Sequence, residues 1–373
     1  MPETKNNKVI LTKPYAKWTE SLWGADHIAV STRVRLARNL AKRPFPQKLN
    51  DVAARELALQ IKEVLYKNKT ILQDALRDEK NLPNQEEDHW NYFEMESLSE
   101  VERQILVEKH FISQDLARRL PGRDVVINDA QNIAIMINEE DHLRMQCILP
   151  GLQLQKGWQE VSQLDDALAN ELDFAFDEKL GYLTSCPSNL GTGMRASVML
   201  HLPALRMTEK LSGIFQQLPQ IGLTVRGVYG EGSKSYGDLY QISNQISLGF
   251  TEEDIISRLQ KVVEQIIEQE EKARTWLWQN NQRNLEDYIW RSYGILANAR
   301  LITSKEAMEQ ISIMRLGVDL GVMKDISMAQ LNQLMVNCQP AFLVMEQGKD
   351  LTVADRDWER AKVTRKYFQK KES

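Results

Sequence analysis

Residues 184 to 197 read Thr-Ser-Cys-Pro-Ser-Asn-Leu-Gly-Thr-Gly-Met-Arg-Ala-Ser and connect two short apolar runs. The runs have the length of strands, and a proline together with Gly191 and Gly193 interrupts any helix between them. The stretch therefore predicts a strand-to-strand connection that carries Cys186 and Arg195. Loops held by a sheet often carry chemistry, and glycines allow a backbone to approach a ligand closely. The alternative is an ordinary turn with a buried cysteine and a solvated arginine, and other loops must decide between the two.

The composition is that of an ordinary globular protein of 373 residues, with 42% hydrophobic and 27% charged residues. No apolar run approaches the roughly 18–20 residues of a membrane span, and residues 1–8 lack the apolar core of a signal peptide. We therefore expect a cytoplasmic protein without a membrane partner. The net charge of −5 argues against general binding to nucleic acid. Three scattered cysteines are too few for a disulfide framework or a zinc cluster, so no structural metal is expected.

Periodicity divides the chain into a mixed region and a helical region. Helical spacing predicts a helix or helix pair over 51–76, a helix near 100–110 after an acidic loop, and an amphipathic helix over 158–176. Short apolar and β-branched runs predict strands at 28–35, at 125–138 (two strands and a turn), 181–184, 195–202, 223–228 and 238–247.

From residue 251 onward, capping sequences predict helices, and few strand patterns occur. Thr-Glu-Glu-Asp at 251–254 is a capping box before a long apolar periodicity. Ser304 and Ser327 each resemble a helix cap followed by further helical spacing. The sequence from about residue 270 therefore predicts a separate helical domain.

Two motifs near strand ends concentrate charged side chains. In the strand that includes residues 31–35, Arg33 and Arg35 share one face, and two guanidinium groups on one face suit a polyphosphate. The alternative is a solvated basic edge strand. Residues 138–144, Asn-Glu-Glu-Asp-His-Leu-Arg, place five ionisable groups directly after a strand. An acidic turn is the alternative there.

A third motif places Arg226 at a strand end and Glu231 between two glycines. This composition suits a flexible lid that carries a carboxylate. The string Gly-Ser-Lys-Ser at 232–235 is not a P-loop, because the lysine does not follow a glycine and the upstream spacing fails. A dinucleotide fingerprint and the catalytic loop of ordinary protein kinases are also missing from the sequence.

Taken together, the motifs STRVRLARN, NEEDHLR, CPSNLGTGMRAS and RGVYGEGS resemble those of the phosphagen (ATP:guanido) kinases, in the same order and approximate spacing. The resemblance covers about residues 20–250. Phosphagen kinases carry a helical domain before the first motif, which here begins at Ser31, and they lack the helical region beyond residue 270. Both departures match the bacterial branch that phosphorylates arginine in proteins. That branch has an Arg-Asp-x-x-Arg-Ala motif for allosteric binding of phosphoarginine, and Arg356, Asp357, Arg360 and Ala361 match it.

The resemblance implies an α+β fold. We expect a flexible N-terminus over 1–20, a catalytic domain over 21–270 built on an antiparallel sheet flanked by helices, and an all-helical domain over 271–373 for dimerisation and phosphoarginine binding.

The resemblance also assigns the site residues, with ATP and Mg²⁺ as cofactors. Nucleotide contacts are expected from Ser31, Thr32, Arg33, Val34, Arg35, His110, Arg144, Arg195, Ala196, Ser197, Val198, Met199, Arg226, Gly227, Val228, Tyr229, Gly230 and Glu231. Met199 stands where phosphagen kinases usually have histidine. Glu140 and Glu231 orient the acceptor guanidinium and take its proton, with Cys186 as a thiolate that neighbouring positive charge favours. Glu139 is expected to organise metal-bound water or the turn.

The activity implied by the resemblance is transfer of the ATP γ-phosphate to arginine side chains in proteins. It further implies that a heat-shock repressor and misfolded proteins are marked in this way for a Clp chaperone–protease, with a zinc-finger activator protein and a homodimer. Two alternatives stay open: a phosphagen kinase of free arginine, which turnover of L-arginine would reveal, and a non-catalytic adaptor that binds phosphoarginine. The intact set of Glu140, Cys186, Glu231 and the arginines disfavours the adaptor.

Overall fold

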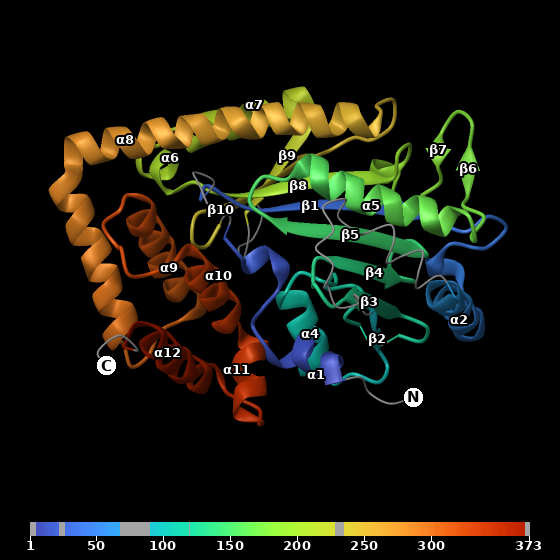
Figure 1. Ribbon diagram of the computed structural model, residues 1–373, viewed down its shortest axis with the longest axis horizontal. Coiled ribbons are helices and arrows are strands. Elements are labelled where there is room, and N and C mark those ends of the chain that lie inside the picture. Colours follow the sequence, from blue (N-terminus) through green and yellow to red (C-terminus); the bar gives the residue numbers. More distant parts are fainter. Residues whose placement is uncertain (1–4, 22–26, 68–89, 119, 228–234, 370–373) are drawn as a thin grey trace, which may run out of the picture.

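The computed structural model describes residues 5–21, 27–67, 90–118, 120–227 and 235–369. Its centre is an eight-stranded sheet with the strand order β2-β3-β4-β5-β1-β8-β10-β9, in which each neighbouring pair is antiparallel (Figure 1). The strands are β1 (Ala29–Arg38), β2 (Trp90–Glu94), β3 (Asp124–Asn128), β4 (Ile133–Ile137), β5 (Leu143–Pro150), β8 (Met194–His201), β9 (Leu223–Gly227) and β10 (Leu239–Asn244). This sheet and its helices confirm the α+β prediction.

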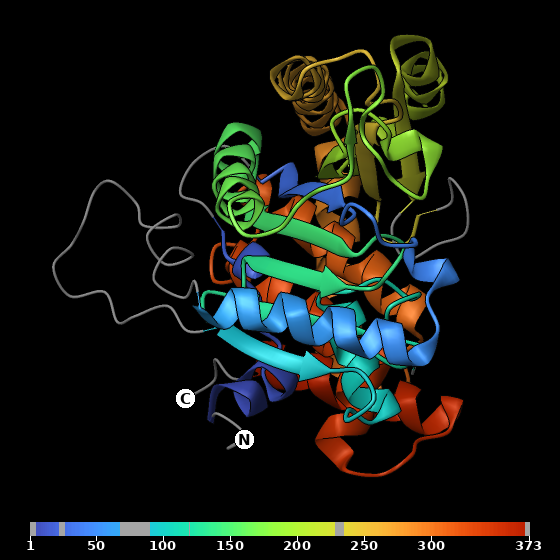
Figure 2. The same ribbon diagram turned by 90° about the vertical axis from the view of Figure 1, so that its right-hand side faces the viewer.

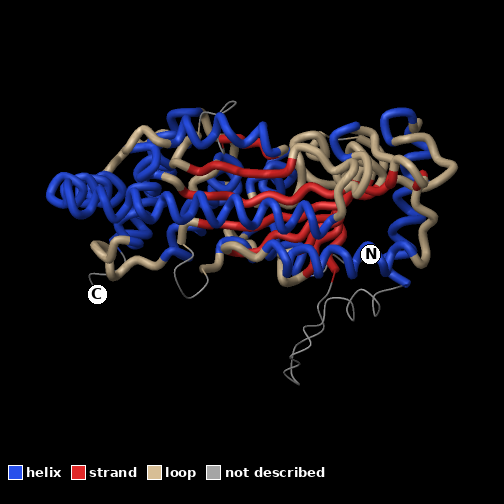
Figure 3. The backbone as a smooth tube through the Cα atoms, turned by 90° about the horizontal axis from the view of Figure 1, so that it is seen from above, coloured by secondary structure: helices blue, strands red, loops and turns tan. Residues whose placement is uncertain are grey.

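One face of the sheet is covered by two helices, α5 (Leu154–Ala169) and the first half of α8 (Glu252–Asn298) (Figures 1 and 3). Helix α5 packs on β1 and β5, and α8 packs on β8 and β10. Gly157 lets α5 come close to β1, because a Cβ at this position would lie only 3.2 Å from Val34 Cγ2. The apolar side chains of the central strands are therefore buried beneath α5 and α8.

The remaining helices of the described ranges are all shorter than α8. Those before α8 are α1 (Lys5–Thr12), α2 (Asp51–Lys67), α4 (Glu100–Glu108), α6 (Pro203–Met207) and α7 (Leu211–Gln217). Those after it are α9 (Ser304–Asp319), α10 (Met328–Asn337), α11 (Pro340–Gln347) and α12 (Val353–Gln369). Single 3₁₀ turns are η1 (Lys17–Thr19), η2 (Pro46–Lys48), η3 (Pro187–Asn189) and η4 (Leu218–Ile221). Figure 2, which is turned by 90° from Figure 1, shows that α2 runs alongside the strands of the sheet. No helix in the described ranges is long and apolar enough to cross a membrane.

Helix α8 joins the mixed and helical parts of the chain. Thr251 caps it in a capping box with Asp254, as the sequence predicts. The helix bends sharply at Asn281, whose backbone is non-helical (φ −143°, ψ 30°), and turns from the sheet toward α9–α12 (Figure 1). The domain boundary expected at residues 270/271 thus falls within the first half of α8, before the bend at Asn281.

Several local predictions were wrong in their bounds. Residues 90–94 form β2 within the segment predicted as an acidic loop, because alternating aromatic side chains there pair with β3. The helix predicted over 158–176 begins at Leu154 and ends at Ala169. The strand predicted at 181–184 is only β7 (Gly181–Tyr182), which pairs with β6 (Phe176–Asp177) in a separate small sheet. The cap expected at Ser304 is Thr303.

Candidate active site

Four arginines from three neighbouring strands project from one face of the sheet. Arg35 of β1 lies directly opposite Arg195 of β8, and Ala37 of β1 lies directly opposite Arg144 of β5. Directly opposed residues of antiparallel strands point to the same side, as do residues two apart on one strand. Arg33, Arg35, Arg144 and Arg195 therefore share a face.

The fifth arginine reaches the same face from the edge of the sheet. Arg226 of β9 is opposite Gln241 of β10, and Gln241 is opposite Met199 of β8. Met199 in turn is opposite Ser31 of β1. Arg226 therefore lies on the side that carries Ser31 and Arg33, and we call this side the arginine face.

Only part of the expected nucleotide set lies on the arginine face. Ser31, Ser197 and Met199 do, whereas Thr32, Val34, Ala196 and Val198 alternate with them and are buried on the opposite side. Thr32, for example, donates to the Gly151 carbonyl (2.7 Å) and accepts from the Gln153 N–H (2.9 Å). Strand alternation directs these four side chains away from the arginines, so any contact of these residues with a nucleotide would come from their backbone.

The expected nucleotide contacts at 227–231 lie at and beyond the end of β9. Gly227 is the last residue of β9 and pairs with Tyr240. Val228, Tyr229, Gly230 and Glu231 lie outside the described residues.

The arginines of the arginine face lie close enough together to repel one another. Burial and the neighbouring arginines lower the pKa of Arg33 to about 10, and they lower that of Arg35 well below its usual value. The Nε atoms of Arg33 and Arg35 are buried and have no hydrogen-bond partner among the described residues. Buried donors are normally satisfied, so these two fit an anionic ligand such as a nucleotide phosphate.

Glu139 is the buried carboxylate that fixes one edge of this cluster. It accepts hydrogen bonds from Ser113 Oγ (2.5 Å), from Arg144 Nη1 (2.6 Å) and from the Glu140 N–H (3.0 Å). Burial alone would raise the pKa of Glu139, but Arg144 and these hydrogen bonds outweigh it, so the net pKa is lowered. Glu139 is therefore ionised and holds Arg144 and the turn in place.

Glu140 and Cys186 both act electrostatically on Arg195. Burial, Arg226 and Arg144 lower the pKa of Arg195, whereas Cys186 and Glu140 raise it, which places both groups within electrostatic range of its guanidinium. Burial raises the pKa of Glu140, with Arg144 acting against it. The Cys186 thiol is partly buried, and its Sγ lies 3.0 Å from Ser188 Oγ. A carboxylate and a thiol thus lie within electrostatic range of the arginine cluster.

A clamp that the sequence did not reveal holds the Glu140 turn against the Cys186 loop. Asp141 Oδ1 accepts hydrogen bonds from Asn39 Nδ2 (2.6 Å) and from the Ser185 N–H (2.7 Å). Gln47 Nε2 donates to the Glu140 carbonyl (2.7 Å), and Gln47 Oε1 accepts from Ser185 Oγ (3.3 Å). Each bond joins residues that are distant in the sequence, so no local pattern could have found them.

His110 lies beside the arginine face, near Arg33. Its backbone is left-handed (φ 66°), and its ring centroid is 5.3 Å from that of Trp18. Its carbonyl accepts from Gln146 Nε2 (2.8 Å), which lies opposite Arg35 on β1. Burial and Arg33 lower the pKa of His110 to about 4, so the ring is neutral at pH 7.

The glycines of the Cys186 loop serve packing within the protein. A Cβ at Gly191 (φ 106°) would lie 2.8 Å from Leu248 Cα, and one at Gly193 (φ 69°) would lie 2.6 Å from the Ala37 carbonyl oxygen. We expected these glycines to let the backbone approach a ligand closely. They instead let it approach other backbone segments of the same chain.

The C-terminal motif on α12 divides into a buried part and a more accessible part. Arg360 is 2% exposed and donates to the carbonyls of Cys338 and Ile302 (both 2.9 Å) and to Asp357 Oδ1 (2.6 Å). Ala361 is fully buried, whereas Arg356 is only partly buried. Arg360 is thus engaged in the structure of the helical domain.

No group of three or more His, Cys, Asp or Glu side chains in the described ranges could hold a metal ion.

Two family models match the chain. Residues 70–273 match the ATP:guanido phosphotransferase C-terminal catalytic domain, and residues 282–373 match the C-terminal domain of the protein-arginine kinase McsB. The junction between the two matches contains Asn281, where α8 bends. The bend therefore coincides with the family's own division of the chain.

Full-length relatives and solved structures agree with these models. A protein-arginine kinase from Brevibacillus brevis is 44% identical over 99% of both chains, and one from Desulforamulus reducens is 45% identical over 96% of this chain and 97% of its own. The substrate-free duplicated taurocyamine kinase from Schistosoma mansoni is similar in structure, with a TM-score of 0.54 and 26% identity over 79% of this chain and 44% of that duplicated chain. The chain therefore belongs to the protein-arginine kinase family, a branch of the ATP:guanido phosphotransferases.

Proposed function

We propose that this protein transfers the γ-phosphate of ATP to the guanidinium of arginine side chains in proteins. The observation that carries the proposal is the arginine face together with Glu140 and Cys186, which lie within electrostatic range of Arg195. One side of this arrangement suits a polyphosphate anion and the other suits a guanidinium cation.

The arginine face would bind and orient the nucleotide phosphates. Arginines stay charged and donate through a planar fork, and the unpartnered Nε atoms of Arg33 and Arg35 offer two such donors. Because Glu139 and the sheet already hold the cluster, little reorganisation is needed when charge develops on the transferring group. A Mg²⁺ ion on the phosphates would add neutralisation of their charge.

The acceptor needs a group that positions it and removes its proton. A guanidinium nitrogen attacks poorly while protonated, since its pKa exceeds about 12. Glu140, whose pKa is raised by burial, can accept a guanidinium N–H and then take the proton as the nitrogen attacks phosphorus. We assign Cys186 to the guanidinium as a thiolate and, by family resemblance, Glu231 as a second carboxylate.

The wider role is also part of the proposal. Family membership supports the marking of a heat-shock repressor and misfolded proteins for a Clp chaperone–protease in the cytoplasm, with a zinc-finger protein as activator. Exposed aromatic side chains on α8, Trp276 (55%) and Trp290 (53%), support a homodimer contact along this helix. For the allosteric site, we assign Arg356 to the phosphate of phosphoarginine, because Arg360 is buried and bonds to backbone carbonyls.

Incubation of the protein with MgATP and an arginine-rich protein, followed by mass spectrometry under non-acidic conditions that preserve the P–N bond, tests the proposal. We expect phosphate on arginine side chains, lost in Glu140→Gln. Phosphate on serine, threonine or lysine instead would contradict the proposed activity, and undiminished arginine phosphorylation in the variant would contradict the role of Glu140.

A further inference from the structure

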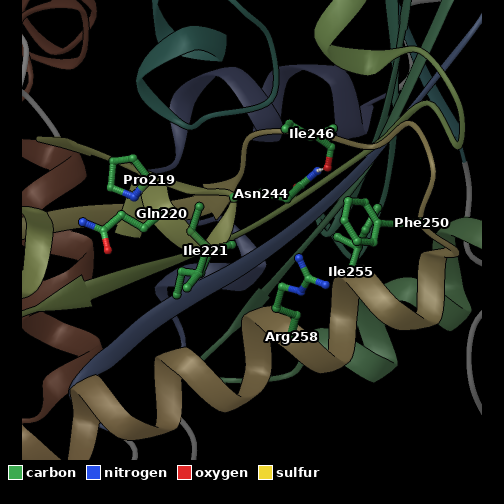
Figure 4. Close-up of a pocket in the computed structure, with 10 residues that line it drawn as sticks. Pro219, Gln220, Ile221, Asn244, Ile246, Phe250, Ile255 and Arg258 are labelled. Atoms are coloured by element: carbon green, nitrogen blue, oxygen red, sulfur yellow. Dashed lines mark hydrogen bonds between the residues drawn. The ribbon is translucent and has the colours of Figure 1, made fainter. Parts of the chain in front are cut away.

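The base of a bound nucleotide needs a place beside the arginine face. The cavity of about 300 Å³ between η4 and the first turns of α8 does not provide it, because α8 covers the opposite face of the sheet (Figure 4). The ring of His110, by contrast, lies near Arg33, and its lowered pKa keeps it neutral. A neutral, partly buried ring next to arginines that suit phosphates is a fitting contact for an uncharged aromatic base.

The turn that carries His110 is held by side chains from distant elements. The backbone of His110 is left-handed (φ 66°), a conformation that residues other than glycine rarely adopt. The carbonyl of Lys109 accepts a hydrogen bond from Trp18 Nε1 (3.2 Å). The carbonyls of His110 and Phe111 both accept from Gln146 Nε2 (2.8 Å each). Two distant side chains therefore maintain this turn in its uncommon conformation.

Trp18 also contacts the ring of His110 directly. The two ring centroids are 5.3 Å apart, and the ring planes are inclined by 46°. Trp18 is completely buried and belongs to η1, which packs on β1 and β5. Trp18 therefore fixes His110 in two ways, through the backbone of the turn and through the ring itself.

Lys109 ties the segment before Trp18 to the same turn. The side chain of Lys109 is completely buried. Its Nζ donates to the carbonyls of Ile10 (2.8 Å) and Lys13 (3.3 Å) and to Gln131 Oε1 (2.6 Å). The two carbonyls lie at the C-terminal end of α1, where a cation is favourable. Helix α1 also lies against α4 (Figure 1). The segment from Ile10 to Trp18 is thus anchored at the end of α4.

We propose that Trp18 is a positioning residue for nucleotide binding, and that Lys109 anchors the segment that carries it. The inference rests on the function proposed above, in which His110 contacts the nucleotide. Trp18 does not touch the nucleotide, but it holds the His110 ring in the orientation that receives the base. The arginines are held by strand pairing, so they bind the triphosphate without this segment.

The test measures the KM for ATP and kcat on an arginine-containing protein. The proteins compared are the wild type, Trp18→Leu, Trp18→Phe, His110→Ala and the double variant of Trp18→Leu with His110→Ala. Inorganic tripolyphosphate, used as a competitive inhibitor, reports on the arginine face without a base. Trp158→Leu is the matched control, because Trp158 is a partly buried tryptophan of α5, which covers the opposite face of the sheet. Circular dichroism checks that each variant is folded.

We expect Trp18→Leu to raise the KM for ATP about 3- to 10-fold, the range of one aromatic contact. The kcat and the inhibition by tripolyphosphate should stay unchanged, as should all values in Trp158→Leu. Trp18→Phe keeps a ring beside His110 and should retain most of the affinity for ATP. In the His110→Ala background, Trp18→Leu should have no further effect, because Trp18 acts through that ring.

Amide hydrogen exchange of the wild-type protein gives a second reading that does not depend on a folded variant. ATP should slow the exchange in residues 106–112 and 10–18, whereas tripolyphosphate should slow it in neither segment. In Lys109→Met the exchange in 10–18 should be faster, because the carbonyls of α1 lose their donor.

Failure of this inference can be told apart from failure of the proposed function. An unchanged KM for ATP in Trp18→Leu, an equal loss in the His110→Ala background, or ATP binding that leaves the exchange of both segments unaltered would overturn the role of Trp18. Exchange in 10–18 that is no faster in Lys109→Met would overturn the anchor. Arginine phosphorylation would stand in each of these cases. A wild-type protein that phosphorylates no arginine would overturn the proposed function, and the role of Trp18 with it.

Discussion

At the scale of single residues, Glu140 is the candidate base of the site and lies within electrostatic range of Arg144 and Arg195. Glu139 is committed to Arg144 and Ser113, so Glu140 is the carboxylate of this turn that is free to act on an incoming guanidinium. Its raised pKa brings it nearer to the working pH of a general base.

Glu140→Gln keeps the shape of the side chain but removes its basicity. We expect kcat to fall by roughly 10²- to 10⁴-fold, the usual contribution of a positioned base. Nucleotide affinity, measured by calorimetry, should be retained. In the wild-type protein, the rate should decrease as the pH falls through a pKa above the ordinary glutamate value, because the protonated carboxyl is not a base. Glu171→Gln, at an exposed position, is the control. An unchanged kcat would remove Glu140 from the chemistry.

Asp141→Ala removes the carboxylate that accepts hydrogen bonds from Asn39 Nδ2 and from the Ser185 N–H of the Cys186 loop. We expect kcat to fall by about 10²-fold, since small displacements of reacting groups cost this much. The KM for ATP should change little, because the arginines are held by the sheet. Gln47→Ala, at an exposed position in the same clamp, should have a smaller effect in the same direction. A loss of ATP affinity without a loss of kcat would show that the clamp has a different role.

At the scale of elements, α4 of the sheet region supports α11 of the helical region. Glu108, the last residue of α4, accepts from the Ala341 N–H (2.9 Å) in the first turn of α11. Its other oxygen, Oε2, is buried and without a partner among the described residues. Burial raises the pKa of Glu108 to about 7, although Arg360 and Arg356 act against it. This contact lies two residues before His110 of the candidate site.

The raised pKa of Glu108 predicts a pH-dependent stability. The folded protein keeps the Glu108 proton up to about pH 7, whereas the unfolded chain releases it near 4.5, so the free energy of unfolding should fall as the pH rises between these values. Glu108→Gln should remove this component, on the order of 3 kcal/mol. Denaturant unfolding of both proteins at pH 5 and pH 8 measures it. Identical pH dependence in the two proteins would contradict the assignment.

Elements with a local signal could be predicted from the sequence. The capping box at Thr251 fixed the start of α8, and the alternation of Arg33 and Arg35 placed both on one face. The same alternation, applied to Thr32 and Val34, would have excluded their side chains from the nucleotide. The Asp141 clamp, the bend at Asn281 and the packing of Gly191 on Leu248 depend on contacts between distant segments, which a periodicity does not contain.

At the scale of the whole molecule, buried polar contacts join the sheet to the C-terminal helices. Ser312 of α9 bonds to His201 Nε2 (2.8 Å) and to Asp238 Oδ2 (2.9 Å), at the ends of β8 and β10. Arg274 of α8 donates to Glu270 (2.8 Å) and also pairs with Asp319 of α9. Such buried pairs are costly to break. A change in the helical domain can therefore be transmitted to the sheet.

The two arginines of the α12 motif should have separable effects. Arg360→Ala leaves the carbonyls of Cys338 and Ile302 without their donor, so we expect a loss of stability on the order of 3 kcal/mol. Arg356→Ala should change stability by less than about 0.5 kcal/mol, but it should weaken the binding of a phosphoarginine peptide. Thermal unfolding and fluorescence anisotropy separate the two. Undiminished peptide binding by the Arg356 variant would move the allosteric site elsewhere.

The arginine face and the Glu140 turn together should phosphorylate arginine within polypeptides. The most direct measurement compares ATP-dependent phosphorylation of an unfolded arginine-containing protein and of free L-arginine, at equal arginine concentration. We expect phosphoarginine to form in the protein at a rate far above that for the free amino acid, and both rates to be lost in Glu140→Gln. A product confined to free arginine would instead identify a phosphagen kinase of the free amino acid.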